Sequence, residues 1–449
     1  MSYKRFGRFY GFLQILVPIS FFFYFRKKQI EKFQNIPKRA PIIFAPNHQN
    51  TLMDPFVTSI YSRRQTGFLA RASAFKNPLV ARILNWLKMK PVYRPRDGME
   101  NLIKNDEVFK ACYEVLSMNM SFIMFPEGSH NRKRHLRLFK KGFTRIALGA
   151  MEESDYQLKV KIVPVGLNYS DHLYQGGDLL VIFGKPIEVA DYIELYKENQ
   201  PKAINKLKIE IHEKTKELII HIDDEEHYEM IDSLREIYRL NMIESLNLRK
   251  RNLFDQFNAD KRTIEKIEKH LSNHLNAAEQ IDNNIKEYKS TLYALKLKES
   301  IFYKNNKSFI IAILNSLLLL ISSPIFAFSI INGFVPYYII RFIIKHQIHD
   351  DHFYTAFKST IGMFLFPIFY MLITIPVILL FNIKIGLIYY LGLFITAKIT
   401  LMIRLLYRET KVRWIYLYAK HFKLDLFNKL ILQRKGIIRI MDNIVEKGS

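Results

Sequence analysis

His48 and Asp54 are the two residues of this sequence whose types and spacing best suit acid–base chemistry. His48 follows a short apolar run, residues 42–45, and the break at Pro46, which predicts a buried strand that ends in a polar turn. Asp54 lies six residues further on, where the first turn of a helix would bring it back to the histidine. A carboxylate bonded to one ring nitrogen fixes the imidazole tautomer and leaves the other nitrogen to accept a proton from a hydroxyl. For this segment alone, a capping aspartate beside a surface histidine is the alternative.

Three more polar motifs follow in order. Residues 90–94 read KPVYR, residues 125–130 read FPEGSH, and residues 162–166 read IVPVG. The second of these motifs is followed by the basic pair Lys140 and Lys141. Taken singly, each has a structural explanation: an arginine at a strand edge, a Pro/Gly turn with a helix cap, and a kinked buried strand. With Asn47 beside the histidine, the candidate site residues in these motifs are Arg94, Glu127, Gly128, Ser129, Lys140, Lys141 and Pro164.

Apolar runs alternate with helix-like runs between residues 36 and about 190, which is typical of an α/β domain. Most of the candidate strands are apolar throughout, as expected for a sheet covered on both faces. The predicted strands are residues 42–45, 67–70, 121–125, 161–167 and 179–183, and the predicted helices between them are residues 77–87 and 106–118.

The chain is strongly basic and strongly apolar, with 67 Lys and Arg against 42 Asp and Glu and 49% hydrophobic residues. This balance suits an anionic membrane surface or anionic substrates. We expect no nucleic-acid partner, because the sequence carries no zinc-type spacing, helix-turn-helix pattern or RNA-binding aromatic signature. Cys112 is the single cysteine, so an intramolecular disulfide is excluded and a reducing, cytosol-facing location is favoured. No metal-ligand spacing is present, and we expect no metal.

Long apolar segments indicate a membrane protein. Residues 6–25 are apolar and aromatic with basic residues on both sides, which fits either a helix lying in the cytosolic leaflet or a true span. Residues 308–344, 361–381 and 385–403 are each long enough for membrane helices. We predict two hairpins, 308–344 and 361–403, which return the basic residues after 403 to the side of the first domain.

In combination, order and spacing, the four motifs resemble the glycerophospholipid acyltransferase superfamily over residues 36 to 190. The resemblance implies that His48 is the general base and that Asp54 orients it. It also implies that Arg94 and the segment at Glu127 bind the phosphate region of the acceptor, and that the strand with Pro164 lines the acyl-donor site. No cofactor is implied beyond the acyl thioester, acyl-CoA or acyl-ACP, as co-substrate.

Two departures refine the resemblance. Five residues separate His48 from Asp54 where four are usual, and Ser129-His130 stands where Thr-Arg is common. Both features resemble the fungal-type glycerol-3-phosphate/dihydroxyacetone-phosphate acyltransferases. Without that arginine, neutralising a phosphate would rest on Arg94, on Lys140 and Lys141, and on Arg137.

The predicted architecture is an acyltransferase-like α/β domain with a mostly apolar central sheet, a helical segment and a C-terminal α-helical membrane domain. The predicted boundaries are 1–30 for a membrane-associated helix, 31–200 for the acyltransferase domain, 201–303 for a helical hairpin or bundle, 304–410 for membrane hairpins and 411–449 for a basic helical tail.

The resemblance predicts an integral protein of the inner (cytoplasmic) membrane, with its catalytic domain facing the cytosol. It would transfer a fatty acyl group to glycerol 3-phosphate or lysophosphatidate without a covalent acyl-enzyme. Its partners would be the bilayer, the thioester donor with or without acyl carrier protein, and the phosphorylated glycerol acceptor. The alternatives are acylation of another lysolipid such as a lyso-aminolipid, a non-catalytic membrane scaffold, and a transporter built on the C-terminal spans.

Overall fold

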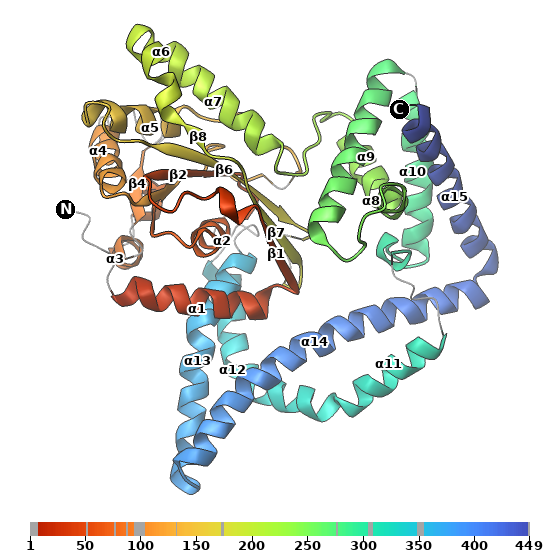
Figure 1. Ribbon diagram of the computed structural model, residues 1–449. Helices are drawn as coiled ribbons and strands as arrows, with labels where there is room; N and C mark the ends of the chain where they lie inside the picture. Colours follow the sequence, from red (N-terminus) through yellow and green to blue (C-terminus); the bar gives the residue numbers. More distant parts are fainter. Residues whose placement is uncertain are drawn as a thin grey trace. The chain divides into compact units, whose positions relative to one another are not determined.

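The computed structural model divides into two compact units (Figure 1). The first comprises residues 1–219 and 342–363, and the second residues 220–341 and 364–449. The residues whose structure is described are 8–50, 53–75, 78–86, 89–93, 104–131, 133–171, 175–274, 277–303, 309–347 and 354–447.

The first unit is built on one mixed sheet with the strand order β1, β7, β6, β2, β5, β3, β4, in which β8 also pairs with β6. The central strand β2 is parallel to both neighbours, β5 and β6, whereas β7 and β8 run antiparallel to β6. All five residues of β2 are buried, as expected for a strand with both faces covered. The strands are β1 (Lys27–Glu31), β2 (Ile42–Pro46), β3 (Thr66–Arg71), β4 (Met89–Val92), β5 (Ser121–Ile123), β6 (Lys161–Tyr169), β7 (Asp178–Phe183) and β8 (Ile187–Glu188).

The predicted α/β fold is confirmed, and the five predicted strands are β2, β3, β5, β6 and β7. The predicted helices correspond to α3 (Pro78–Trp86) and α4 (Lys104–Ser117). The sequence analysis did not predict β1, β4 and β8. For β1 the reason is its composition, because Lys27, Lys28 and Glu31 make it read as a solvated charged segment. Pairing with β7 and the bond from Arg26 Nε to Asp178 Oδ1 (2.9 Å) hold it in the sheet instead.

Helices cover both faces of the sheet, and alternate residues of β2 point into two separate cores (Figure 1). Ile43 and Ala45 belong to the core shared with α4, α5 and α7, while Ile42 and Phe44 belong to the core shared with α1 and α2. The helices of this unit are α1 (Arg8–Tyr24), α2 (Met53–Ser62), α3, α4, α5 (Gly142–Glu153), α6 (Ile193–Glu198) and α7 (Gln200–Lys216).

The first unit extends beyond the predicted domain boundary at residue 200. Helix α7 packs on α5 and β6, and its residues Ala203, Leu207 and Ile211 are part of the core. The first stretch of this compact unit therefore continues to Ile219. Helix α7 is rich in Glu and Lys, which explains why the boundary was predicted before it. These charged residues lie on its exposed side, and the opposite side is apolar and buried.

Helix α1 presents two apolar sides. Val17 and Phe21 are buried in the core beneath the sheet. Ile15 and Phe22, by contrast, are more than half exposed. One side of α1 is therefore covered by protein, and the apolar exposed side is the one that could meet lipid.

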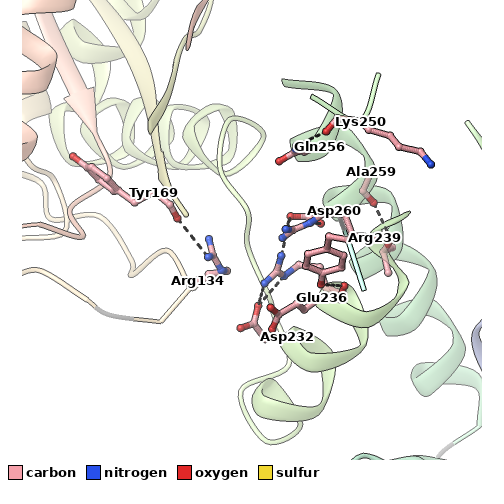
Figure 2. Close-up of polar contacts among 12 residues, drawn as sticks. Arg134, Tyr169, Asp232, Glu236, Arg239, Lys250, Gln256, Ala259 and Asp260 are labelled. Carbon is pink, nitrogen blue, oxygen red and sulfur yellow. Dashed lines mark hydrogen bonds and ion pairs between the residues drawn. The ribbon is translucent and has the colours of Figure 1, made fainter. Parts of the chain in front are cut away.

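The second unit contains a bundle of α8 (Tyr228–Ser245), α9 (Leu253–Asn273), α10 (Ala277–Ala294) and the C-terminal helix α15 (Leu424–Lys447). Buried ion pairs join α8 to α9: Asp260 accepts hydrogen bonds from Arg235 Nη1 at 2.8 Å and from Arg239 Nε at 2.7 Å (Figure 2). The residue types explain this pairing, because a buried charge is stable only when it is paired and hydrogen-bonded.

The same unit holds most of the apolar helical sequence. Within the described part of the chain, three helices are long and apolar enough to cross a membrane: α12 (Ser323–Gln347), α13 (Tyr354–Leu380) and α14 (Ile383–Phe422). The predicted hairpin at 361–403 corresponds to α13 and α14. In the predicted hairpin at 308–344, the first helix is α11 (Phe309–Ile321), whose 13 residues are fewer than the ~20 that span a bilayer core. The predicted boundary at 410 falls inside α14, which continues unbroken to Phe422.

Candidate active site

His48 leaves the sheet at the carboxyl end of β2, and Asp54 sits in the first turn of α2. Asn47, between strand and histidine, is buried and forms two hydrogen bonds with the backbone of Leu167 in β6: its amide donates to the carbonyl at 3.1 Å and its oxygen accepts from the N–H at 2.7 Å. Asn47 therefore fixes the start of the turn against the neighbouring strand. Its amide group bonds to β6, and the residue also lines the hollow beside the dyad.

The predicted pairing of His48 with Asp54 is present in the structure. Nδ1 of His48 lies 2.9 Å from Oδ2 of Asp54, and the same oxygen accepts backbone N–H bonds from Gln49 at 2.9 Å and Asn50 at 2.8 Å. The other oxygen, Oδ1, accepts the hydroxyl of Tyr169 at 2.6 Å. Four donors thus satisfy a fully buried carboxylate.

This geometry sets the chemistry of the imidazole. With Nδ1–H donating to Asp54, Nε2 is the nitrogen left to accept a proton. The ring stacks on Phe125 with 4.1 Å between centroids, and His130 meets it edge-on at 6.1 Å. The side chain is 12% exposed, so a hydroxyl can reach a base that is otherwise shielded from water.

Glu127 is buried and joins two loops through their backbones. Its Oε1 accepts the N–H of His48 at 2.6 Å and its Oε2 accepts the N–H of Arg137 at 3.2 Å. Burial raises the pKa of Glu127 to about 7, and the two N–H bonds oppose that rise. Since both oxygens contact backbone N–H groups, Glu127 acts as a clamp on the His48 turn. The role that the resemblance implies for its segment, binding the phosphate region of the acceptor, stays a prediction.

Residues 128–130 form a tight turn that Arg137 contacts, and these four residues are called the basic turn below. Gly128 has a φ of +72°, in the left-handed region that favours glycine, and its N–H bonds to the carbonyl of Phe125. Ser129 Oγ accepts a hydrogen bond from Arg137 Nη1 at 2.6 Å. Arg137 therefore stands beside the motif in which the usual arginine is replaced by His130.

The remaining predicted residues lie at different depths. Lys140 and Lys141 are exposed just before α5; the N–H of Lys140 bonds to the carbonyl of Pro126. Pro164 is buried inside β6 opposite Ala45, so in this structure it is a core residue of the sheet. Arg94 lies outside the described residues.

A small hollow opens beside the dyad, and it brings in residues that the sequence did not single out. Its lining is Asn47, His48, Gln49, Glu127, Asn131, His135, Leu136 and Ile219. The polar residues near the dyad that the sequence did not single out are Gln49, Asn131 and His135 in this lining and Tyr169 on Asp54. Tyr169 could have been inferred, because it ends a strand parallel to β2, and parallel strands bring their carboxyl ends to one edge.

Asp54→Asn is expected to lower the rate of the reaction that uses His48 by roughly 10²–10⁴-fold. An asparagine amide that donates towards Nδ1 would favour the wrong tautomer, with the proton on Nε2. Thermal unfolding in detergent should show that the variant remains folded. A variant that retains wild-type turnover would contradict the dyad.

The first unit is thus an α/β domain with a mostly parallel central sheet and a histidine–aspartate pair at the carboxyl end of its central strand. Residues 27–168 match the family model described as Acyltransferase, and the matched segment holds His48, Asp54 and Glu127.

Two curated relatives are glycerolipid acyltransferases by name. The chain is 28% identical over 191 residues to a chloroplastic 1-acyl-sn-glycerol-3-phosphate acyltransferase of Arabidopsis thaliana, covering 41% of this chain and 50% of the relative. It is 28% identical over 134 residues to the glycerol-3-phosphate O-acyltransferase 1 of Saccharomyces cerevisiae, covering 29% and 18%. The chain thus spans half or less of these two relatives.

A solved structure was also found. The 1-acyl-sn-glycerophosphate acyltransferase of Thermotoga maritima is 20% identical, with a TM-score of 0.31, and the match covers 46% of this chain and 83% of the other.

Proposed function

We propose that this protein is a membrane-bound O-acyltransferase that moves a fatty acyl group from a thioester to glycerol 3-phosphate or its monoacylated product. The observation that carries the proposal is the dyad, in which Nδ1 of His48 lies 2.9 Å from Asp54 Oδ2 and the histidine lines the hollow. The relatives' names supply the acceptor class.

The reaction follows from the role of the other ring nitrogen, Nε2. Nε2 takes the hydroxyl proton as the oxygen attacks the thioester carbon, so the new C–O bond forms while charge develops on the carbonyl oxygen. The C–S bond then breaks, and the proton passes from the imidazolium to the departing thiolate. No covalent enzyme intermediate is needed in this scheme, and Cys112 is no candidate nucleophile because it is fully buried.

The acceptor's phosphate is proposed to lie over the basic turn. Arg137 is exposed and hydrogen-bonded to Ser129, close to His130, whose ring meets that of His48 edge-on. A guanidinium can hold a phosphate through two parallel hydrogen bonds, which positions the glycerol hydroxyl against the base. Lys140 and Lys141 add positive charge on the same side of the motif.

Arg94 is proposed as a second phosphate ligand on the strength of its motif. Arg94→Ala is expected to raise the KM for the acceptor more than that for the donor, and Arg94→Lys to recover only part of the loss, because an ammonium cannot form the planar two-point contact. Steady-state kinetics with each substrate varied in turn would measure this. Equal changes in both KM values would assign Arg94 to the fold or to the donor.

The membrane side of the proposal rests on the three long apolar helices and the exposed apolar side of α1. A bilayer would deliver both the acyl chain and a lipid acceptor. The catalytic domain is proposed to face the cytosol, where acyl-CoA and acyl carrier protein are found.

The acceptor can be identified with purified protein in detergent and a labelled acyl thioester. Glycerol 3-phosphate, dihydroxyacetone phosphate and lysophosphatidate are compared with a lyso-aminolipid that has no phosphate group. Preference for a phosphate monoester supports the proposal. Preference for the lyso-aminolipid would overturn the acceptor assignment, and the absence of any transfer would favour a non-catalytic scaffold.

A further inference from the structure

Tyr169 reaches the dyad from a strand far away in the sequence. It is the last residue of β6, which lies beside β2, and its hydroxyl donates to Asp54 Oδ1 at 2.6 Å. The opposite oxygen, Oδ2, is the one that engages His48. The carboxylate of Asp54 is thus held between the imidazole on one side and the phenol on the other.

The phenol ring is itself held firmly. Tyr169 is 3% exposed, and its ring stacks on Phe25, just beyond the end of α1, with 6.2 Å between centroids. Its backbone pairs with Leu179 in β7, and its carbonyl accepts a hydrogen bond from Arg134 Nη2 at 3.4 Å (Figure 2). A side chain fixed at both its ring and its backbone can fix the group that it contacts.

The direction of the hydrogen bond is also defined. Burial and the neighbouring Asp54 raise the pKa of Tyr169 well above its usual value, so the phenol keeps its proton and donates it. Without that donor, Oδ1 would be a buried acceptor with one partner fewer, and the carboxylate could rotate about its Cβ–Cγ bond. Rotation would move Oδ2 out of line with Nδ1 of the histidine.

We propose that Tyr169 is a positioning residue of the dyad, which locks the Asp54 carboxylate in the orientation that holds His48 in its reactive tautomer. This role rests on the proposed function, because it is defined by the reaction that His48 performs. Tyr169 does not contact the reacting atoms, and its effect passes entirely through Asp54.

Tyr169→Phe tests the proposal, because it keeps the ring and its stacking on Phe25 and removes only the hydroxyl. We expect kcat to fall roughly tenfold, as for the loss of one hydrogen bond to a charged group, with both KM values within about twofold of wild type. Tyr24→Phe is the matched control. Tyr24 is buried in the same core, its hydroxyl has no hydrogen-bond partner among the described residues, and its loss should leave kcat unchanged.

The double variant with Asp54→Asn separates positioning from packing. If Tyr169 acts through Asp54, adding Tyr169→Phe to Asp54→Asn should lower kcat no further, so the effects of the two changes are not additive. This background also removes the buried carboxylate that the single variant would leave short of a donor. Folding is followed by thermal unfolding in detergent.

Three results would overturn the proposal. They are a kcat of Tyr169→Phe equal to that of wild type, a loss of activity in Tyr24→Phe as large as that in Tyr169→Phe, and losses in kcat that multiply in the double variant. A wild-type protein that transfers no acyl group to any acceptor is a different outcome, since it would overturn the proposed function and the role of Tyr169 with it.

Discussion

Replacing His48 by alanine is expected to reduce acyl transfer by roughly 10²–10⁴-fold, which is the usual contribution of a positioned general base. The effect should be on kcat, because the ring lies at the edge of the hollow and takes the proton only as the bond forms. The alanine variant should remain folded, since the turn is still held by Glu127 on the backbone N–H of residue 48 and by Asn47 on β6.

His274→Ala is the matched control for this change. His274 is exposed at the end of α9, in the other compact unit, and its replacement should leave activity unaltered. The rate is measured with labelled acyl thioester and the preferred acceptor at saturating concentrations. Wild-type turnover in His48→Ala would remove the general base from the mechanism.

Glu127→Gln is expected to lower kcat by about 10- to 100-fold, because one of the two clamped loops loses its acceptor. A carboxylate accepts from both His48 N and Arg137 N, whereas a glutamine amide has one acceptor oxygen and turns its NH₂ group towards the other N–H. The His48 turn would then shift relative to the basic turn. Glu153→Gln, on the exposed side of α5, is the control and should have no effect.

The stability of the wild-type protein relative to Glu127→Gln is expected to depend on pH. The pKa of Glu127 is raised from 4.5 to about 7, so the folded state binds the proton more tightly than the unfolded state does. Its contribution to stability is therefore complete below about pH 4.5 and is lost as the pH rises to about 7. The stability of wild type relative to Glu127→Gln should fall across that window, as measured by thermal unfolding in detergent. A difference that is constant between these pH values would contradict the assignment.

The sequence was informative wherever a local pattern decides the structure. The apolar runs of β2, β5 and β6 predict buried strands, and the six-residue step from His48 to Asp54 fits a strand exit followed by a helical turn. Local patterns fail where tertiary pairing decides. The charged strand β1 exists because β7 offers it an edge, and α7 belongs to the first unit because one side of it is buried there.

The roles of individual site residues depended on contacts between distant segments. Glu127 was predicted as a motif residue, and its hydrogen-bond partners are two backbone N–H groups, which no side-chain pattern reveals. Tyr169 is separated from Asp54 by 115 positions, and only the adjacency of β2 and β6 brings them together. The depth of Pro164 in the sheet likewise follows from its register opposite Ala45.

The central claim is that the acyl group passes directly from thioester to hydroxyl with His48 as the base. A single-turnover experiment tests it: purified protein in excess is mixed with acyl-labelled thioester and the preferred acceptor, quenched, and separated into protein and lipid. The label should move from thioester to the acylated acceptor without appearing on the protein, and His48→Ala should leave it on the thioester. Label bound covalently to the protein, or undiminished product from His48→Ala, would contradict the account.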